Sequence, residues 1–192
     1  MPGVDWAVPT LPGEMVTLRP IGAADAEDLW IGVSDPEGRQ QTGGGDGRTR
    51  EEIAEWAAGA AELEGRYDWA MCTDGGLMVG AIALEDVDPA SRRAEIRLLT
   101  NPGHRGRGYG REAIMLVLTF AFVGPDGAGL GLHRVGLEVL SINPRAAALY
   151  QSLGFVVEGR IRESYLDSGR YYDAILMGVL EDEYAVASAG WR

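Results

Sequence analysis

The sequence predicts an α+β fold in which one mixed, mostly antiparallel central sheet is flanked by helices. Three observations support this prediction. Residues 67–100 read as three strands separated by turns, residues 111–123 form an apolar stretch at helical spacing, and residues 155–180 read as a strand pair. Because further strands and helices alternate around these segments, we expect the element order β-α-α-β-β-β-α-β-α-β-β.

The N-terminal part predicts one short strand and two helices. Residues 16–20 alternate apolar and polar side chains and end at proline, as a short strand does. An acidic first turn indicates a helix over residues 25–33, and a second helix begins at the capping-box pair Thr49 and Glu52. The glycine-rich, polar segment 34–48 between them is expected to be a mobile loop.

The remaining elements follow from the same periodicities. We expect strands over residues 67–73, 77–87, 93–100, 133–140, 155–163 and 171–180. Helices are expected over residues 111–123 and 143–153, the second of them ended by Gly154. Residues 124–127 break the chain between two of these elements, and no internal repeat or interdomain linker is visible.

Length and composition indicate one domain. The chain has 192 residues, of which 46% are hydrophobic, and this suffices for a single core. No apolar run is long enough to span a bilayer, and the N-terminus lacks the pattern of a signal peptide. Cys72 is the only cysteine, which excludes an internal disulfide, and its apolar neighbours favour a buried core position. We therefore expect a cytoplasmic protein.

The charge is strongly acidic, with one basic exception. The formal net charge is −12, and all 17 basic residues are arginine. Such a chain repels nucleic acid and anionic membranes as a whole, so neither is expected as a partner. Seven basic residues nevertheless gather within twenty positions: Arg92, Arg93, Arg97, His104, Arg105, Arg107 and Arg111. This local cluster indicates a bound anion.

A glycine-rich turn lies inside that cluster. Residues 105–110 read Arg-Gly-Arg-Gly-Tyr-Gly between a predicted strand and a predicted helix. Successive backbone N–H groups in such a turn, together with the helix N-terminus, make a binding site for phosphate. Taken alone, the same pattern also fits an ordinary strand-to-helix turn.

Three segments together resemble the GNAT superfamily of N-acetyltransferases, in particular its Rim-type branch. The first is the glycine turn 105–110, and the second is residues 143–150 followed by Leu153-Gly154-Phe155. The third is Glu158-Gly159-Arg160 leading to residues 169–173. The resemblance extends over about residues 15–181. It implies the GNAT fold in a single acetyltransferase domain 1–192, with extensions at 1–14 and 182–192.

The resemblance implies acetyl-CoA as co-substrate and no metal ion. Backbone groups of one strand would pair with the pantetheine arm of the coenzyme. Backbone N–H groups of the glycine turn would hold its pyrophosphate. The residues implied in cofactor binding are Leu98, Leu99, Thr100, Arg105, Gly106, Arg107, Gly108, Tyr109, Gly110, Arg111 and Asn143.

The resemblance also implies direct attack of an amine on the thioester. Such a reaction needs a base to deprotonate the amine and an acid to protonate the leaving thiolate. Tyr150 matches the position of the general acid, although packing against Phe155 is an alternative role for it. Glu95 and Glu138 match two family positions for the base, and either is equally open to a purely solvated or paired role. Ser141 is a further residue near the reaction centre.

The acceptor amine is less well determined. The acidic residues of the first helices and of segment 43–47 would favour a small cationic amine, such as a polyamine or an aminoglycoside-like antibiotic, or a protein N-terminus. These carboxylates are Asp25, Glu27, Asp28, Asp35, Glu37 and Asp46. Two alternatives remain, namely a GNAT enzyme that uses another acyl donor and a non-catalytic acyl-CoA-binding regulatory module. The family resemblance also allows a homodimer.

Overall fold

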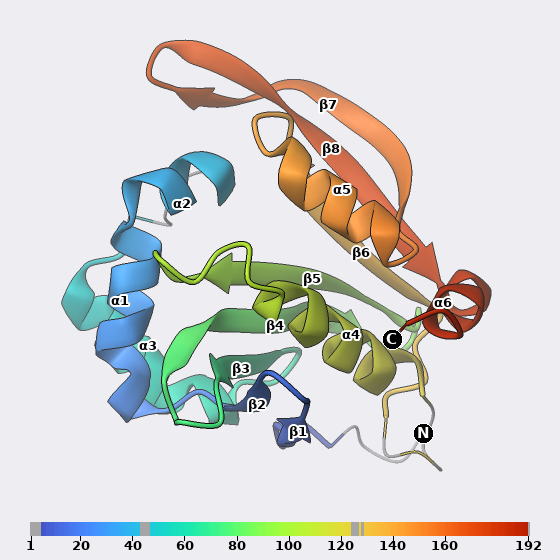
Figure 1. Cartoon of the computed structure of the whole chain (residues 1–192), viewed down its shortest axis with the longest axis horizontal. Helices are drawn as coiled ribbons and strands as arrows, with labels where there is room; N and C mark the ends of the chain where they lie inside the picture. The colour runs from blue at the N-terminus through green and yellow to red at the C-terminus, as the bar shows by residue number, and fades with distance from the viewer. Residues whose placement is uncertain (1–4, 43–46, 124–126, 128, 192) are drawn as a thin grey trace.

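Eight strands form one sheet in the computed structural model, which describes residues 5–42, 47–123, 127 and 129–191 (Figure 1). The strands are β1 (Leu11–Pro12), β2 (Thr17–Pro20), β3 (Tyr67–Cys72), β4 (Met78–Asp88), β5 (Arg93–Thr100), β6 (Arg134–Leu140), β7 (Val156–Asp167) and β8 (Arg170–Leu180). Their order in the sheet is β1-β2-β3-β4-β5-β6-β8-β7. The predicted α+β class with a single mixed sheet is therefore confirmed.

Within the described residues, six α-helices accompany the sheet. They are α1 (Ala26–Ser34), α2 (Pro36–Thr42), α3 (Arg50–Gly59), α4 (Tyr109–Phe122), α5 (Pro144–Ser152) and α6 (Glu181–Ser188), with short 3-10 turns at Ala23–Asp25 and Ala60–Glu62. Among the described residues, no helix is both long and apolar enough to cross a membrane.

One irregularity in the sheet positions the site. All neighbouring strands pair antiparallel except β5 and β6, which run parallel. That parallel pairing holds for only three residue pairs and ends at Glu95 and Gly136. Residues 96–100 of β5 therefore pair with β4 alone, and Figure 1 shows β5 and β6 spreading apart beyond their paired end.

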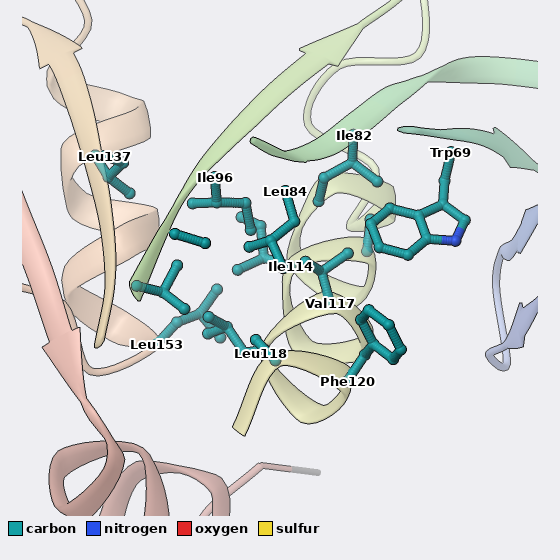
Figure 2. Packing of buried hydrophobic residues seen from close by; sticks show 14 of the residues in the cluster. Trp69, Ile82, Leu84, Ile96, Ile114, Val117, Leu118, Phe120, Leu137 and Leu153 are labelled. Carbon is teal, nitrogen blue, oxygen red and sulfur yellow. The ribbon is translucent and has the colours of Figure 1, made fainter. Parts of the chain in front are cut away.

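The side chains of the sheet alternate between two cores. Trp69 of β3 points to the larger core, where its ring packs edge-to-face with Phe120 of α4 at a centroid distance of 5.6 Å (Figure 2). Ala70 and Cys72 point to the opposite face, into a smaller core with α1 and α3. Cys72 is buried, as predicted, and burial raises the pKa of its thiol.

The sequence-based expectations fail mainly in the segment after α1. The predicted mobile loop contains α2, which begins at Pro36. Proline suits the first position of a helix, because an N–H group there would have no partner within the helix. The Asp35 carboxylate accepts from the Gly38 N–H at 2.7 Å and stabilises this first turn. The glycine content of the segment concealed this helix. Residues 43–46 of the predicted loop and 124–126 of the predicted break lie outside the described residues.

Two short elements were also not predicted, and one local prediction is confirmed in detail. Strand β1 and helix α6 extend the fold at either end, outside the periodic segments. The capping box at the start of α3 forms as expected. Glu52 N donates to Thr49 Oγ1 at 3.2 Å, and Thr49 N donates to Glu52 Oε2 at 2.7 Å.

The turn between β1 and β2 is attached to α4 by one carboxylate. Glu112, in the first turn of α4, accepts hydrogen bonds from the backbone N–H groups of Glu14, Met15 and Val16 at 2.7–2.8 Å. A Cβ atom at Gly13 would lie 2.8 Å from the Glu112 carboxyl carbon, so the turn requires glycine there. Three otherwise unpaired donors are satisfied at once, which fixes the turn against the helix.

We expect Glu112→Gln to lower the free energy of unfolding by about 1–2 kcal/mol, because glutamine replaces charge-assisted hydrogen bonds by weaker ones and adds a donor. Chemical denaturation measures this difference. Glu51→Gln is the matched control, since Glu51 lies exposed in the first turn of α3 and makes no hydrogen bond within the described residues. Its effect should stay within about 0.5 kcal/mol. Equal effects of the two substitutions would contradict the attachment.

Candidate functional site

The separation of β5 from β6 opens a cavity of about 910 Å³. Its walls come from both strands, from the glycine turn before α4, and from α2 and α5. All of the predicted site residues line it except Arg107 and Ser141. Segments that lie far apart in the sequence thus meet in one cleft, with the glycine turn at one end and Glu95 at the other.

The glycine turn has the backbone geometry of an anion site. Gly106 and Gly108 have φ values of +75° and +93°, in the left-handed region that favours glycine. Gly108 is the N-cap residue of α4 and has no side chain to pair with the N–H groups of the first helical turn. These donors and the positive end of the helix dipole therefore remain available to a ligand in the cleft.

Arginines without acidic partners surround this turn. Arg107, Arg111 and Arg145 form no ion pair within the part of the chain that the structure describes. The Arg145 guanidinium lies so close to Gly106 that a Cβ atom there would collide with it. Two of these three arginines, Arg111 and Arg145, line the cleft. The glycine end of the cleft therefore carries uncompensated positive charge.

Arg105 differs from its neighbours, although the sequence grouped it with them. Its guanidinium donates to the carboxylates of Asp35 at 2.6 Å and Glu37 at 3.0 Å. Partial burial favours a raised pKa for Asp35, but the hydrogen bonds from Arg105 and from the Gly38 N–H outweigh it and lower that pKa. Arg105 thus ties the glycine turn to α2 and is not free to face a phosphate through its side chain.

Tyr150 lies in the wall of the cleft as a protonated phenol. It is buried, its ring packs edge-on against Phe155 at 5.6 Å, and burial raises its pKa to about 12. Both roles considered for it from the sequence are thus compatible with its position. Its hydroxyl has no hydrogen-bond partner among the described residues, so it remains available to a ligand.

The structure distinguishes the two glutamates proposed as base. Glu95 is half-buried, and its carboxylate lies across Gly136 of β6, within 2.5 Å of where a Cβ atom would stand. Burial raises the pKa of Glu95, and the nearby Arg134 guanidinium only partly offsets this effect. Glu138 is exposed on the same face of the sheet. Glu95 therefore has the environment of a carboxylate adapted to proton transfer.

Two residues near the start of α5 have defined local roles. Asn143 is the N-cap of α5, where its Oδ1 accepts from Ala146 N at 3.1 Å, and it also lines the cleft. Its side-chain amide remains the group that would reach a coenzyme. Ser141 does not line the cleft, since its Oγ accepts from Asp173 N at 3.1 Å.

The acidic residues at the other end of the cleft are mostly not those expected from the sequence. Asp25 is buried and paired with Arg19, and Glu27 pairs with Arg50. Asp46 lies outside the described residues. The carboxylates that line the cleft are Glu37, Glu85, Asp86, Glu95 and Glu138. The sequence missed Glu85 and Asp86 because they lie at a β-bulge, where Asp86 has a φ of +52°.

The described residues contain no group of three or more His, Cys, Asp or Glu side chains that would hold a metal ion. His104 also lines the cleft, and its Nδ1 is buried without a hydrogen-bond partner in the described part of the chain. The sequence named His104 only as a member of the basic cluster around the glycine turn. Such a nitrogen is suited to a ligand that brings its own hydrogen-bonding group.

The chain is similar to known acetyltransferases over most of its length. The family model described as an acetyltransferase (GNAT) domain matches residues 15–156. The spermidine N(1)-acetyltransferase of Vibrio cholerae is 34% identical over 107 residues, which is 56% of this chain and 59% of that enzyme. A prophage-derived, uncharacterized N-acetyltransferase of Bacillus subtilis is 29% identical over 174 residues, or 90% of this chain and 93% of that protein.

Solved structures share the fold. The crystal structure of the spermidine N-acetyltransferase from Vibrio cholerae in complex with CoA and spermine superposes with a TM-score of 0.80 at 24% identity, covering 90% of this chain and 99% of that one. The sequence match to the curated Vibrio enzyme spans little more than half of its length, namely 59%.

We expect Gly108→Asp to weaken the binding of acetyl-CoA by about 100-fold or more, since it places a negative side chain where the phosphate-binding N–H groups converge. Isothermal titration measures the affinity. Gly103→Asp is the matched control, because Gly103 has a similar φ of +78°, open space around it and no place in the lining of the cleft. Equal losses in both variants would mean that backbone strain, and not the phosphate cradle, governs binding.

Proposed function

The chain belongs to the GNAT acetyltransferase family, and from this membership we propose that it transfers the acetyl group of acetyl-CoA to a primary amine. The observation that carries the proposal is the cleft between β5 and β6, which ends at a glycine turn with free N–H donors. One end of this cleft is basic and the other acidic. It therefore suits an anionic donor and a cationic acceptor that meet in the middle.

The donor lies along β5. Residues Leu98, Leu99 and Thr100 have no partner strand on the β6 side, so their backbone groups are available to the amide-containing arm of the coenzyme. The N–H groups of the turn, with Arg111 and Arg145, hold the phosphates. This arrangement directs the thioester toward Glu95 and Tyr150.

The reaction is a direct transfer in a ternary complex. Glu95 takes a proton from the bound ammonium, directly or through water, and the neutral nitrogen attacks the thioester carbonyl carbon. The new C–N bond forms, the C–S bond breaks, and Tyr150 gives its proton to the departing thiolate. The attacking nitrogen then loses its second proton through water to the Tyr150 phenolate, which restores the phenol, and Glu95 releases the first proton to solvent. Cys72 takes no part, because it is buried on the other side of the sheet from the larger core.

The carboxylates that line the cleft support an acceptor amine that arrives as a cation. The names of the Vibrio relatives make spermidine the first polyamine to test. Assignment to the Rim-type branch, a homodimer and a cytoplasmic location stay predictions from the sequence. A non-catalytic acyl-CoA-binding module is the main alternative, and the presence of Glu95 and Tyr150 in the cleft argues against it.

The proposal is tested by titration of the protein with acetyl-CoA, followed by thiol release across a panel of amines. The panel includes spermidine, an aminoglycoside, amino acids and a short peptide with a free N-terminus. Acetyl-CoA binding with amine-dependent release of CoA supports the enzyme. Tight binding without turnover on any amine supports the module, and turnover only with a longer acyl-CoA supports another donor.

We expect Glu95→Gln to abolish the acid limb of the pH–activity profile, whereas Glu138→Gln should leave that limb in place. In the wild type, activity should rise with pH through a pKa above the ordinary glutamate value of 4.5, because burial raises the pKa of Glu95 and only its ionised form accepts the proton. Initial rates at saturating acetyl-CoA, measured from acidic to neutral pH, give the limb.

Gly136→Ala provides a second test of Glu95 without removing it. The three atoms nearest to the added Cβ atom all belong to the carboxyl end of the flexible Glu95 side chain, so the fold should persist while the carboxylate moves. Turnover should fall by about tenfold or more with an unchanged affinity for acetyl-CoA. If Gly136→Ala and Glu95→Gln both retain the wild-type rate and profile, Glu95 is not the base.

Tyr150→Phe should lower kcat by about 100-fold or more, since loss of a general acid typically costs two to four orders of magnitude. Binding of acetyl-CoA should change little, because the ring still packs against Phe155. The two quantities come from steady-state kinetics and titration of the same preparation. An unchanged kcat would remove Tyr150 from the chemistry and leave it a packing residue.

A further inference from the structure

A second, smaller cavity lies beside the main cleft. It has a volume of about 160 Å³ and is lined by α1, α2, α3 and the face of β4 and β5 opposite to α4. The two cavities share six lining residues: Gly38, Thr42, Glu85, Arg97, Leu98 and Leu99. The smaller cavity, called the side pocket below, is therefore a branch of the cleft at its acceptor end.

The side pocket exists because β4 presents small side chains to α1 and α3. Ala81 and Ala83 lie under it, while Leu29, Ile53 and Trp56 form its walls. A dry apolar cavity of about 150 Å³ is known to accept benzene. A volume of about 160 Å³ is thus sufficient for one aromatic ring or a branched apolar group of similar size.

The charged residues of the side pocket are mostly basic. Arg39, Arg48, Arg66 and Arg97 line it, against only Asp68 and Glu85. The Asp68 carboxylate is buried, and both of its oxygens accept from Arg66, at 2.6 and 2.7 Å. This pairing neutralises Asp68. Arg66 also pairs with Glu85 at 3.5 Å. Arg39 and Arg97 line the side pocket and form no ion pair within the described residues, so they offer positive charge to a ligand, whereas the neighbouring part of the main cleft is lined by carboxylates.

Arg97 is the arginine that lines both the main cleft and the side pocket. It is exposed and forms no ion pair within the described residues. Arg107, Arg111 and Arg145 also lack such partners and surround the glycine turn, whereas Arg162 and Arg170, which lack them too, line neither cavity. By the same electrostatic argument, Arg97 is placed to meet an anionic group of the acceptor.

The spacing on β5 suits an amine and an anion on one molecule. Glu95 and Arg97 lie two residues apart on the same face of the strand, which separates their Cα atoms by about 6.7 Å. At this Cα separation, the long side chains of Glu95 and Arg97 can reach an ammonium and a carboxylate that are attached to the same carbon atom. Ala83, the residue paired with Arg97 across the sheet, leaves the space beside them open to a third substituent.

We propose that the preferred acceptor is a small amine that carries both a carboxylate and an apolar arm of aromatic size, as an aromatic α-amino acid does. The ammonium binds at Glu95, the carboxylate pairs with Arg97, and the arm fills the side pocket. A linear polyamine would leave the side pocket empty and bring a second cation toward Arg97. This inference rests on the proposed function and narrows it to one substrate class.

The test compares three acceptors with the full-length protein and saturating acetyl-CoA. L-Phenylalanine has all three groups, 2-phenylethylamine lacks the carboxylate, and spermidine lacks both the carboxylate and the ring. We expect kcat/KM for phenylalanine to exceed each of the others by about tenfold or more, as expected for one lost charged or well-packed contact.

Two variants assign the preference to its residues. Arg97→Gln should remove the advantage of phenylalanine over phenylethylamine and leave the rate with phenylethylamine nearly unchanged. Ala83→Leu should fill the side pocket and lower kcat/KM for both aromatic amines by about tenfold or more, while sparing glycine as a small acceptor. Arg162→Gln is the control, since Arg162 is also exposed and unpaired in the described residues but lines neither cavity. Unchanged acetyl-CoA affinity shows that each variant is folded.

The outcomes separate this inference from the proposed function. A preference for spermidine, or an equal response of phenylalanine and phenylethylamine to Arg97→Gln, overturns the inference while acetyl transfer stands. Absence of turnover with every amine, despite acetyl-CoA binding, overturns the proposed function and the inference with it. The expected ranking, lost in Arg97→Gln and retained in Arg162→Gln, establishes the substrate class.

Discussion

The site depends on one interruption of hydrogen bonding in the sheet. Parallel pairing between β5 and β6 stops at Glu95 and Gly136, although both strands continue. Buried backbone groups rarely stay unpaired, so a strand edge inside a domain is itself a binding surface. Here that edge runs from the phosphate-binding turn to the proposed base. In the proposed reaction, the same interruption creates the space, leaves backbone groups for the donor and sets the direction in which the two reactants would meet.

Charge is divided along the cleft in the same direction. Arginines surround the glycine turn, and most carboxylates of the cleft lie away from it on β4, β5 and β6, namely Glu85, Asp86, Glu95 and Glu138. Arg105 connects the glycine turn to α2, because its guanidinium pairs with the carboxylates of Asp35 and Glu37. The net charge of −12 therefore says little about the ligands. What matters is which charges lack partners, since those are the ones free to bind.

Local patterns predicted the sheet class, the meander, the capping box and the glycine turn, because each of these depends on neighbours in sequence. They did not predict α2, whose first turn depends on Pro36 and the Asp35 carboxylate within a glycine-rich segment. Nor did they distinguish Glu95 from Glu138, since the difference is burial against β6. Glu85, Asp86 and the side pocket depend on a bulge and on packing across the sheet, which no local pattern encodes.

Amide hydrogen exchange with and without acetyl-CoA tests the central claim most directly. If the coenzyme completes the open edge of β5, the amides of residues 98–100 and 106–111 should gain protection together on binding. The paired residues of β4 should change little, because their partners are already present. Protection confined to other segments, or none in the presence of saturating acetyl-CoA, would contradict the assignment of the cleft between β5 and β6 as the donor site.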